Sequence, residues 1–219
     1  IVICALPTAL LLAQPNTSTA LLILAVGATM YFAAGAPWRD FGILALCIIT
    51  AFSAVASVRP YVLERVQTFL NPSANALSSG YQIQQSLIAI GSGGLLGRGF
   101  GQSVEKFNYL PEPSGDSVFA VFAEETGFVG AIFLLVLFVA LAARGIAIAG
   151  NSRDLFGGLL ALGFCSLIIL QAFINICAML GMIPLTGLPL PFVSHGGTAL
   201  AATLLMCGFI LNVAAHRKA

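Results

Sequence analysis

The chain has 219 residues, of which 59% are hydrophobic and only 8% charged, with a formal net charge of +1 and a mean hydropathy of +1.01. A soluble globular domain carries about 25% charged residues, so this composition excludes that class and predicts an integral membrane protein. The charges are nearly balanced and no basic run occurs, so we expect no nucleic-acid binding.

Apolar segments of the length that crosses a bilayer, about 20 residues, recur along the chain. The first, 1–13, is too short and follows no charged leader, so we interpret it as the end of a span in a fragment of a longer protein, not as a signal peptide. Five complete candidates follow: residues 17–36, 40–58, 117–143, 155–178 and 197–214. The predicted fold is an all-α integral membrane protein, a polytopic helical bundle of about six transmembrane segments forming one membrane domain over 1–219.

The cysteines lie in these apolar segments, without CxxC spacing or a His at ligand spacing. We therefore interpret them as small buried hydrophobic residues, not as metal ligands or disulfides. The five are Cys4, Cys47, Cys165, Cys177 and Cys207.

Basic residues in short loops predict the orientation of a membrane protein. When the spans alternate, one side receives five Lys and Arg residues, and the short loops of the other side receive none. The five are Arg39, Arg144, Arg153, Arg217 and Lys218. We therefore expect a cytoplasmic C-terminus and an external location for the long loop 59–116.

Two irregular external stretches are predicted, the large loop 59–116 and a second loop 180–196. Within the first, Ser86–Leu96 is too short to span and is expected to be re-entrant or interfacial. The glycines between 91 and 101 lack a Walker lysine and a βαβ unit, so we interpret them as turns and close backbone approaches, not as a nucleotide site. Irregular backbone near membrane depth needs protein or water around it, so the two loops predict a polar cavity open to the outside.

Four of the eight acidic residues fall within Leu110–Glu125. Asp116 precedes an apolar helix, where it fits two roles. It could cap the helix N-terminus, or it could be a partly desolvated carboxylate with a raised pKa that acts as a general base.

Glu124 and Glu125 lie inside a predicted span and about 100° apart around the helix. Each costs roughly 2.5–3.5 kcal/mol if it faces lipid, so at least one is expected to point into the bundle. Two interpretations stay open: a structural pair with a Ser, Thr or Arg from another span, or a direct part in proton or cation handling.

Three blocks resemble one family. YQIQQSLIAIGSGGLLGRGFGQSVEKFNYLPEPSGDSVFAVFAEETGFVG, residues 81–130, closely resembles the SEDS family of shape, elongation, division and sporulation proteins. MIPLTGLPLPFVSHGG, residues 182–197, resembles the last external loop of that family, and QPNTSTA, residues 14–20, its shorter external motif. Ser103 and Lys106 before YLPE resemble the division-type, FtsW-like branch more than the elongation-type, RodA-like branch.

The resemblance implies the last six of about ten spans. It also implies a peptidoglycan glycosyltransferase that polymerises lipid II at the outer face of the bacterial cytoplasmic membrane during cell division. The family's essential aspartate stands at Asp116. There it would take the proton from the 4-hydroxyl of an acceptor GlcNAc, which attacks the donor MurNAc with inversion. Undecaprenyl pyrophosphate leaves as a stable anion, which needs positive charge but no general acid.

The resemblance also implies substrate contacts. Arg98, Lys106 or a divalent cation (Mg or Mn) would stabilise the pyrophosphate; no other cofactor is expected. The remaining candidate contacts are Gln14, Gln82, Gln85, Ser86, Glu112, Ser194 and His195. For Gln82, Gln85 and Ser86, the alternative role is to satisfy loop backbone groups.

Two positions depart from the family pattern, which usually has Asp where Asn16 stands and Tyr where His195 stands. Asn16 keeps the hydrogen-bonding capacity but not the charge of a cation site. His195 would either titrate near the cavity or replace a Tyr hydroxyl as a hydrogen-bonding group.

The implied partners are lipid II, membrane lipids and a class B penicillin-binding protein with transpeptidase activity. Two other functions fit the same features: a flippase that transports lipid II, and a scaffold that only positions the transpeptidase.

Overall fold

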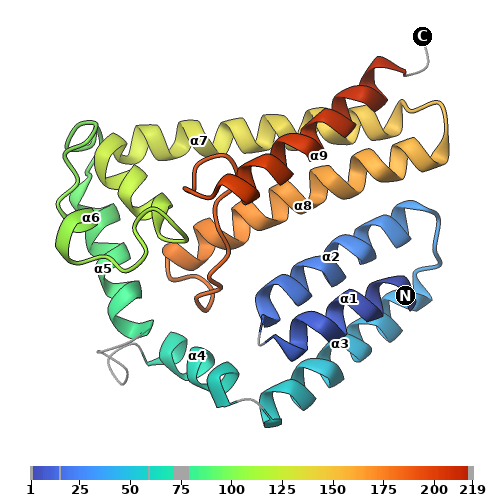
Figure 1. Ribbon diagram of the computed structural model, residues 1–219, viewed down its shortest axis with the longest axis horizontal. Coiled ribbons are helices and arrows are strands. Elements are labelled where there is room, and N and C mark those ends of the chain that lie inside the picture. The colour runs from blue at the N-terminus through green and yellow to red at the C-terminus, as the bar shows by residue number, and fades with distance from the viewer. Residues whose placement is uncertain (1, 15, 59, 72–78, 217–219) are drawn as a thin grey trace. The chain divides into compact units, whose positions relative to one another are not determined.

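The computed structural model describes residues 2–14, 16–58, 60–71 and 79–216, and every regular element in these ranges is a helix (Figure 1). The helices are α1 Val2–Ala13, α2 Thr17–Ala33, α3 Arg39–Val58, α4 Pro60–Leu70, α5 Ser79–Ser92, α6 Glu105–Asn108, α7 Val118–Gly150, α8 Leu155–Met179 and α9 Gly197–Ala215. Two compact units are present. Unit 1 comprises Ile1–Leu63, Ala142–Leu170 and Leu205–Ala219, and unit 2 comprises Glu64–Leu141 and Gln171–Leu204.

The predicted apolar segments are helical. Within the described residues, α7, α8 and α9 are long and apolar enough to cross a membrane, and α2 is a shorter apolar helix. The number of six spans stays a prediction, and Arg217 and Lys218, used for the orientation, lie outside the described residues. Helix α7 was predicted to end at 143 but continues to Gly150. It passes the exposed Arg144, because a long basic side chain can extend its charge away from an apolar helix.

Unit 1 is held together by close helix contacts around the first half of α8. A Cβ on Gly163 would overlap Met30 of α2, and one on Gly145 of α7 would overlap Cys165. Phe164 stacks on Phe209 of α9, with ring centroids 5.4 Å apart. Small residues at such points let apolar helices approach closely.

The cysteine interpretation holds in part. Cys47, Cys165, Cys177 and Cys207 form no disulfide in the described part of the chain, where no group of three or more His, Cys, Asp or Glu that could hold a metal ion occurs. Cys165 is buried, but Cys47 is exposed on α3, so the prediction that all the cysteines are buried is wrong. The helix pattern did not reveal which face of α3 is covered.

Unit 2 is built around an interruption of α7. Gly127 has φ 70° and ψ −169°, which breaks the helix, and residues 94–99 lie alongside the break. Arg98 N and Gly99 N donate to the carbonyls of Glu124 and Glu125, each at 3.0 Å. Phe128 N donates to Gly94 O at 2.9 Å. The neighbouring loop thus satisfies backbone groups that the break frees, as apolar surroundings require.

Glycine makes this contact possible. A Cβ on Gly97 would overlap Glu125 O, and one on Gly127 would overlap Gly97 N and Leu95. Gly94, Gly97, Gly99 and Gly101 have positive φ. The interpretation as turns and close backbone approaches is therefore confirmed for these glycines. It is wrong for Gly91, which lies inside α5, where an added Cβ would meet no atom within 4 Å.

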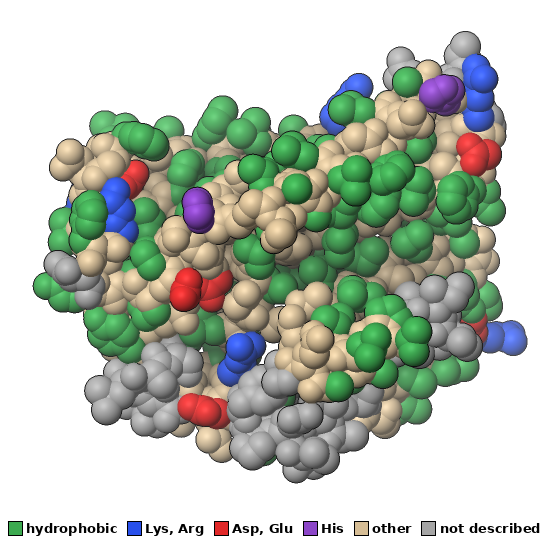
Figure 2. All heavy atoms as spheres, viewed as in Figure 1, with side chains coloured by type: hydrophobic (Ala, Val, Ile, Leu, Met, Phe, Trp, Pro, Cys, Tyr) green, Lys and Arg blue, Asp and Glu red, His purple; other side chains and the backbone are tan. Residues whose placement is uncertain are grey.

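The surface fits a bilayer environment. On the face in Figure 2, hydrophobic side chains dominate over the long helices, and charged side chains are few. Phe128, Val129 and Phe133 of α7 are among the exposed large hydrophobic residues. Such a surface is typical of helices that contact lipid.

Candidate active site

Asp116 lies in the loop that leads into α7, two residues before the helix begins at Val118. Its carboxylate is half-buried and accepts hydrogen bonds from Gln82 Nε2 of α5, at 3.3 Å to Oδ1 and 3.4 Å to Oδ2. The same nitrogen donates to Ser117 Oγ at 2.9 Å, and Ser117 Oγ donates to Pro111 O at 2.9 Å. The carboxylate in the loop is therefore oriented by a side chain of α5.

Burial raises the pKa of Asp116 above the ordinary value for an aspartate. The hydrogen bonds from Gln82, from its own backbone amide and from Ser117 act in the opposite direction, and the negative charge of Glu112 raises the pKa further. A carboxylate whose pKa is raised binds a proton more tightly than an ordinary aspartate, which suits the role of a general base. Among the described residues, its hydrogen bonds do not go to first-turn amides of α7, so the geometry favours the base over the helix cap.

The stretch 180–196 between α8 and α9 contains no helix and is bound to the loop that carries Asp116. Ser194 Oγ donates to Gly115 O at 2.6 Å and accepts from Leu190 N at 2.7 Å. His195 N donates to Ser114 O at 2.8 Å. A Cβ on Gly187 would lie 3.9 Å from Asp116 Oδ2, so this stretch lies beside the carboxylate.

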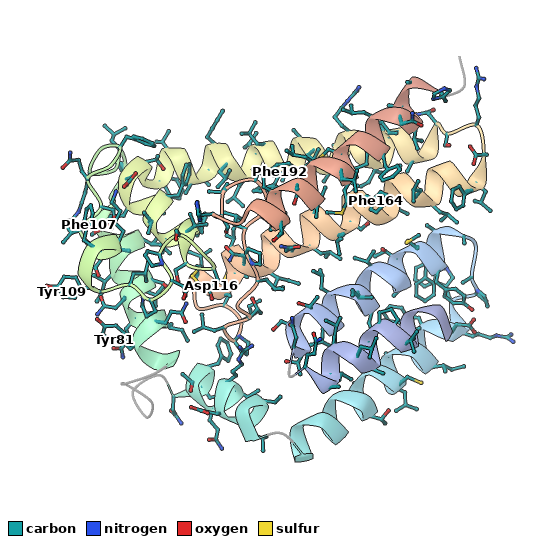
Figure 3. All side chains as sticks on the ribbon, viewed as in Figure 1. Tyr81, Phe107, Tyr109, Asp116, Phe164 and Phe192 are labelled. Carbon is teal, nitrogen blue, oxygen red and sulfur yellow. The ribbon has the colours of Figure 1, made fainter. Side chains whose placement is uncertain are left out.

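The end of α8 joins the two loops. Asn175 Nδ2 donates to Asp116 O at 2.6 Å and to Leu188 O at 2.7 Å. One turn earlier, Gln171 Nε2 donates to Pro189 O at 2.8 Å. Figure 3 shows Asp116 close to the end of α8, away from Phe107 and Tyr109, which are exposed.

Several predicted site residues meet here. The structure brings Gln82, Asp116, Ser194 and the backbone of His195 together. The His195 side chain is exposed, and neither of its two proposed roles is decided by these contacts. Glu112 lies in the same loop as Asp116 with an exposed side chain, and its carbonyl accepts from Gly115 N at 3.0 Å. Gln85 is half-buried one turn after Gln82.

Ser86 is a correction. Its side chain is completely buried, and Oγ donates to Gln82 O at 2.8 Å and lies 3.5 Å from Met179 Sδ. The hydroxyl thus faces α8 and bonds a carbonyl of its own helix, so its burial argues against the predicted substrate contact. The alternative role, satisfying loop backbone groups, is not observed either, because Gln82 lies in α5.

The shorter motif lies in unit 1. Asn16 precedes α2, and its side-chain oxygen accepts from Thr19 N at 3.2 Å, so it acts as a helix N-cap. Gln14 is exposed in the same turn.

Glu124 and Glu125 are both buried and paired. Glu124 accepts from Ser103 Oγ at 2.5 Å and from Val104 N at 3.1 Å, and lies 3.5 Å from Arg98 Nη1. The interpretation as a structural pair is thus favoured over proton or cation handling. The expected partner from another span is wrong: the partners belong to the loop 98–106, because that loop folds along the break in α7.

Arg98 and Lys106 are not gathered around Asp116. Lys106 Nζ lies 2.6 Å from Glu125 Oε1 and donates to Gly101 O at 3.0 Å. The predicted pyrophosphate-binding cations therefore already face carboxylates. The Arg98 side chain is 42% exposed, so part of its guanidinium stays accessible.

The sequence interpretation missed Asn175 and Arg65. The available signal for Asn175 was a pair of amides, Gln171 and Asn175, four residues apart in an apolar span, where polar side chains are costly. Arg65 Nη1 donates to Thr186 O at 3.5 Å, beside the stretch that flanks Asp116. Only the folding of α4 against this stretch reveals that contact.

Comparison with known proteins agrees with this architecture. The family model described as cell cycle protein, covering FtsW, RodA and SpoVE, matches residues 1–219. Stage V sporulation protein E of Bacillus subtilis (strain 168) is 42% identical over 209 residues, which is 95% of this chain and 57% of that protein. The probable peptidoglycan glycosyltransferase FtsW of Coxiella burnetii is 43% identical over 208 residues, 94% of this chain and 56% of that protein. Peptidoglycan glycosyltransferase MrdB of Escherichia coli (strain K12) is 38% identical over 217 residues, 97% of this chain and 58% of that protein.

Solved structures match as well. One match is a chain from a structure that describes how a peptidoglycan synthase complex coordinates polymerization and crosslinking. It superposes with a TM-score of 0.75 at 33% identity, over 98% of this chain and 61% of that chain. The rod shape determining protein RodA of Thermus thermophilus superposes with a TM-score of 0.64 at 32% identity, over 100% of this chain and 57% of that chain. The chain thus spans little more than half the length of the proteins it matches. Because the family model covers every residue, the chain belongs to the SEDS family of FtsW, RodA and SpoVE proteins and is a polytopic helical membrane protein.

Proposed function

We propose that the full-length protein is a peptidoglycan glycosyltransferase that polymerises lipid II into glycan strands. The observation that carries the proposal is the Asp116 carboxylate. It is half-buried with a raised pKa, is oriented by Gln82 and is flanked by the stretch 180–196. The relatives FtsW and MrdB are named peptidoglycan glycosyltransferases, which supports the same reaction here.

In the proposed reaction, Asp116 accepts the proton of the acceptor's 4-hydroxyl as that oxygen bonds to the anomeric carbon of the donor MurNAc. The bond from that carbon to the pyrophosphate oxygen breaks with inversion. Its electron pair leaves with undecaprenyl pyrophosphate, so the leaving group needs no proton. Gln82 keeps the carboxylate facing the acceptor.

The pyrophosphate needs positive charge. Arg98, and Lys106 to a smaller extent because of its close pair with Glu125, are two candidates. Arg65 is a third candidate, because its guanidinium donates to Thr186 O. Thr186 precedes Gly187, the residue that lies beside the Asp116 carboxylate. No group of three or more metal-binding side chains occurs among the described residues. A Mg or Mn ion would therefore take most of its ligands from phosphate and water, as Mg does at many phosphate sites.

The proposed setting is the outer face of the bacterial cytoplasmic membrane, with a cytoplasmic C-terminus and a class B penicillin-binding protein as partner. The match to a chain of a peptidoglycan synthase complex supports such a partner. A role in division is favoured by Ser103 and Lys106, the residues of the division-type motif. Ser103 donates to Glu124 and Lys106 to Glu125, so the residues of that motif attach the loop to α7.

Polymerisation by the purified full-length protein in detergent tests the proposal. With lipid II as the sole substrate, we expect glycan polymer, detected by gel electrophoresis. A flippase has no compartment to transport into and a scaffold has no chemistry, so either alternative predicts no polymer without a partner enzyme. A parallel reaction with a chelator separates the two sources of charge: lost activity assigns the pyrophosphate to a divalent cation, and retained activity assigns it to the arginines and Lys106.

A further inference from the structure

Asn175 stands out as a buried polar residue whose hydrogen bonds converge on the candidate base. Its side chain is 1% exposed near the end of an apolar helix. Both protons of Nδ2 are used, at 2.6 Å to Asp116 O and 2.7 Å to Leu188 O. Two carbonyl acceptors fix which end of the amide is the nitrogen, because an oxygen there could donate to neither.

The other end of the amide has no such partner. Asn175 Oδ1 is buried and accepts no hydrogen bond from the described residues. A buried, unpaired acceptor is unfavourable, and an apolar residue would avoid it. The two donated bonds must therefore be worth more to the protein than this cost, which is expected where a functional group has to be held in place.

We propose that Asn175 is a positioning residue for Asp116: its amide ties the peptide that carries the carboxylate to the stretch 180–196. This inference rests on the proposed function for its meaning in catalysis, but not for its geometry. Without the tie, the Asp116 peptide is free to move away from Leu188, and its carboxylate gains access to water. Asn175 itself touches no reacting atom.

Gln171 supplies a matched control. It lies one turn earlier on α8, and its Nε2 donates to Pro189 O at 2.8 Å, the carbonyl next to Leu188 in the chain. Removing it loosens the same stretch without touching Asp116. Asn175→Leu and Gln171→Met both replace an amide with an apolar side chain of similar size, so the pair isolates the bond to Asp116.

We expect Asn175→Leu to lower the kcat of lipid II polymerisation by about 10–100-fold with little change in KM, because misplacing a catalytic group affects the transition state more than binding. Gln171→Met should stay within about threefold of the wild type. The acid limb of the Asn175→Leu profile should also move to lower pH, because a carboxylate that reaches water loses the burial that raises its pKa. Both variants leave the other titratable or charged groups of the elements packed here unchanged. These are Glu112 and His195 of the two loops, Glu64 and Arg65 of α4, Tyr81 of α5 and Cys177 of α8.

A second readout does not depend on activity. An apolar carbodiimide modifies protonated carboxyl groups, and mass spectrometry follows its addition to Asp116 as a function of pH. The midpoint should fall in Asn175→Leu and stay in place in Gln171→Met. Equal effects of the two variants on kcat, with unmoved labelling midpoints, would overturn the inference.

A wild type that makes no polymer would overturn the proposed function instead, and the labelling would still decide the role of Asn175. If Asn175→Leu does not accumulate, Asn175→Ser and Gln171→Ser are compared by the same criteria.

Discussion

Asp116→Asn is expected to reduce lipid II polymerisation by at least about a hundredfold, the contribution of a general base at the low end of its usual range. The amide has the shape of the carboxylate and can still accept from Gln82 Nε2, so the fold should persist. It cannot take a proton from a sugar hydroxyl. Initial rates of polymer formation by the purified full-length variant, at equal folded concentration, measure the effect.

Asp154→Asn is the control for this change. Asp154 lies before α8 and accepts from Gly157 N at 2.8 Å, and asparagine caps a helix about as well as aspartate. The same exchange of a carboxylate for an amide should leave polymerisation unchanged there. Polymerisation at the wild-type rate by Asp116→Asn would contradict the assignment of Asp116 as the general base.

Gly127→Ala is expected to cause the largest loss of stability. Gly127 combines φ 70° with ψ −169°, a conformation that is essentially restricted to glycine and costs other residues about 1–3 kcal/mol. The added Cβ would also overlap Gly97 N and Leu95, and such overpacking costs a further 1–3 kcal/mol or so. We expect the unfolding midpoint in detergent to fall by roughly 5 °C or more.

Gly91→Ala is the control, because it shows whether any glycine-to-alanine substitution lowers the stability. Gly91 lies in α5, and a Cβ there meets no atom within 4 Å. Alanine is the better helix former by about 1 kcal/mol, so the midpoint should hold or rise. An equal fall of the unfolding midpoint in both variants would contradict this account. It would mean that the contact between residues 94–99 and the break in α7 does not stabilise the fold.

The sequence predicted the helices of the apolar segments, because hydrophobic runs and prolines mark where a membrane helix can lie. It did not predict α4, α5 and α6 as separate helices, which lie within the stretch 59–116 interpreted as a long loop. It did not predict the break in α7. Gly127 in an apolar segment looks like any small residue at a helix contact, and its role depends on a glycine-rich loop some thirty residues earlier in the chain. The partners of Glu124 and Glu125 were misassigned for the same reason, since that loop supplies them.

Part of the candidate site could be predicted from the sequence. Asp116 and Gln82 were identified from the family motif, and the structure places them in contact. Ser86 lies in the same motif, one turn from Gln82, yet faces α8, and a motif does not reveal which side of a helix is covered. Asn175 was missed because an amide inside a span gains meaning only when its acceptors, two loop carbonyls, are known.

The pH dependence of polymerisation tests the role of Asp116 most directly. Because burial raises the pKa of Asp116, its base form is lost as the pH falls through a value above the ordinary aspartate range of about 4. The measurement is kcat/KM of the full-length protein from acid to neutral pH, with the residual activity of Asp116→Asn in parallel. The wild type should lose activity along an acid limb with a pKa above that range, and the limb should be absent from the variant. A wild-type rate that stays constant down to about pH 4, or the same limb in Asp116→Asn, would contradict the assignment of Asp116 as the proton acceptor.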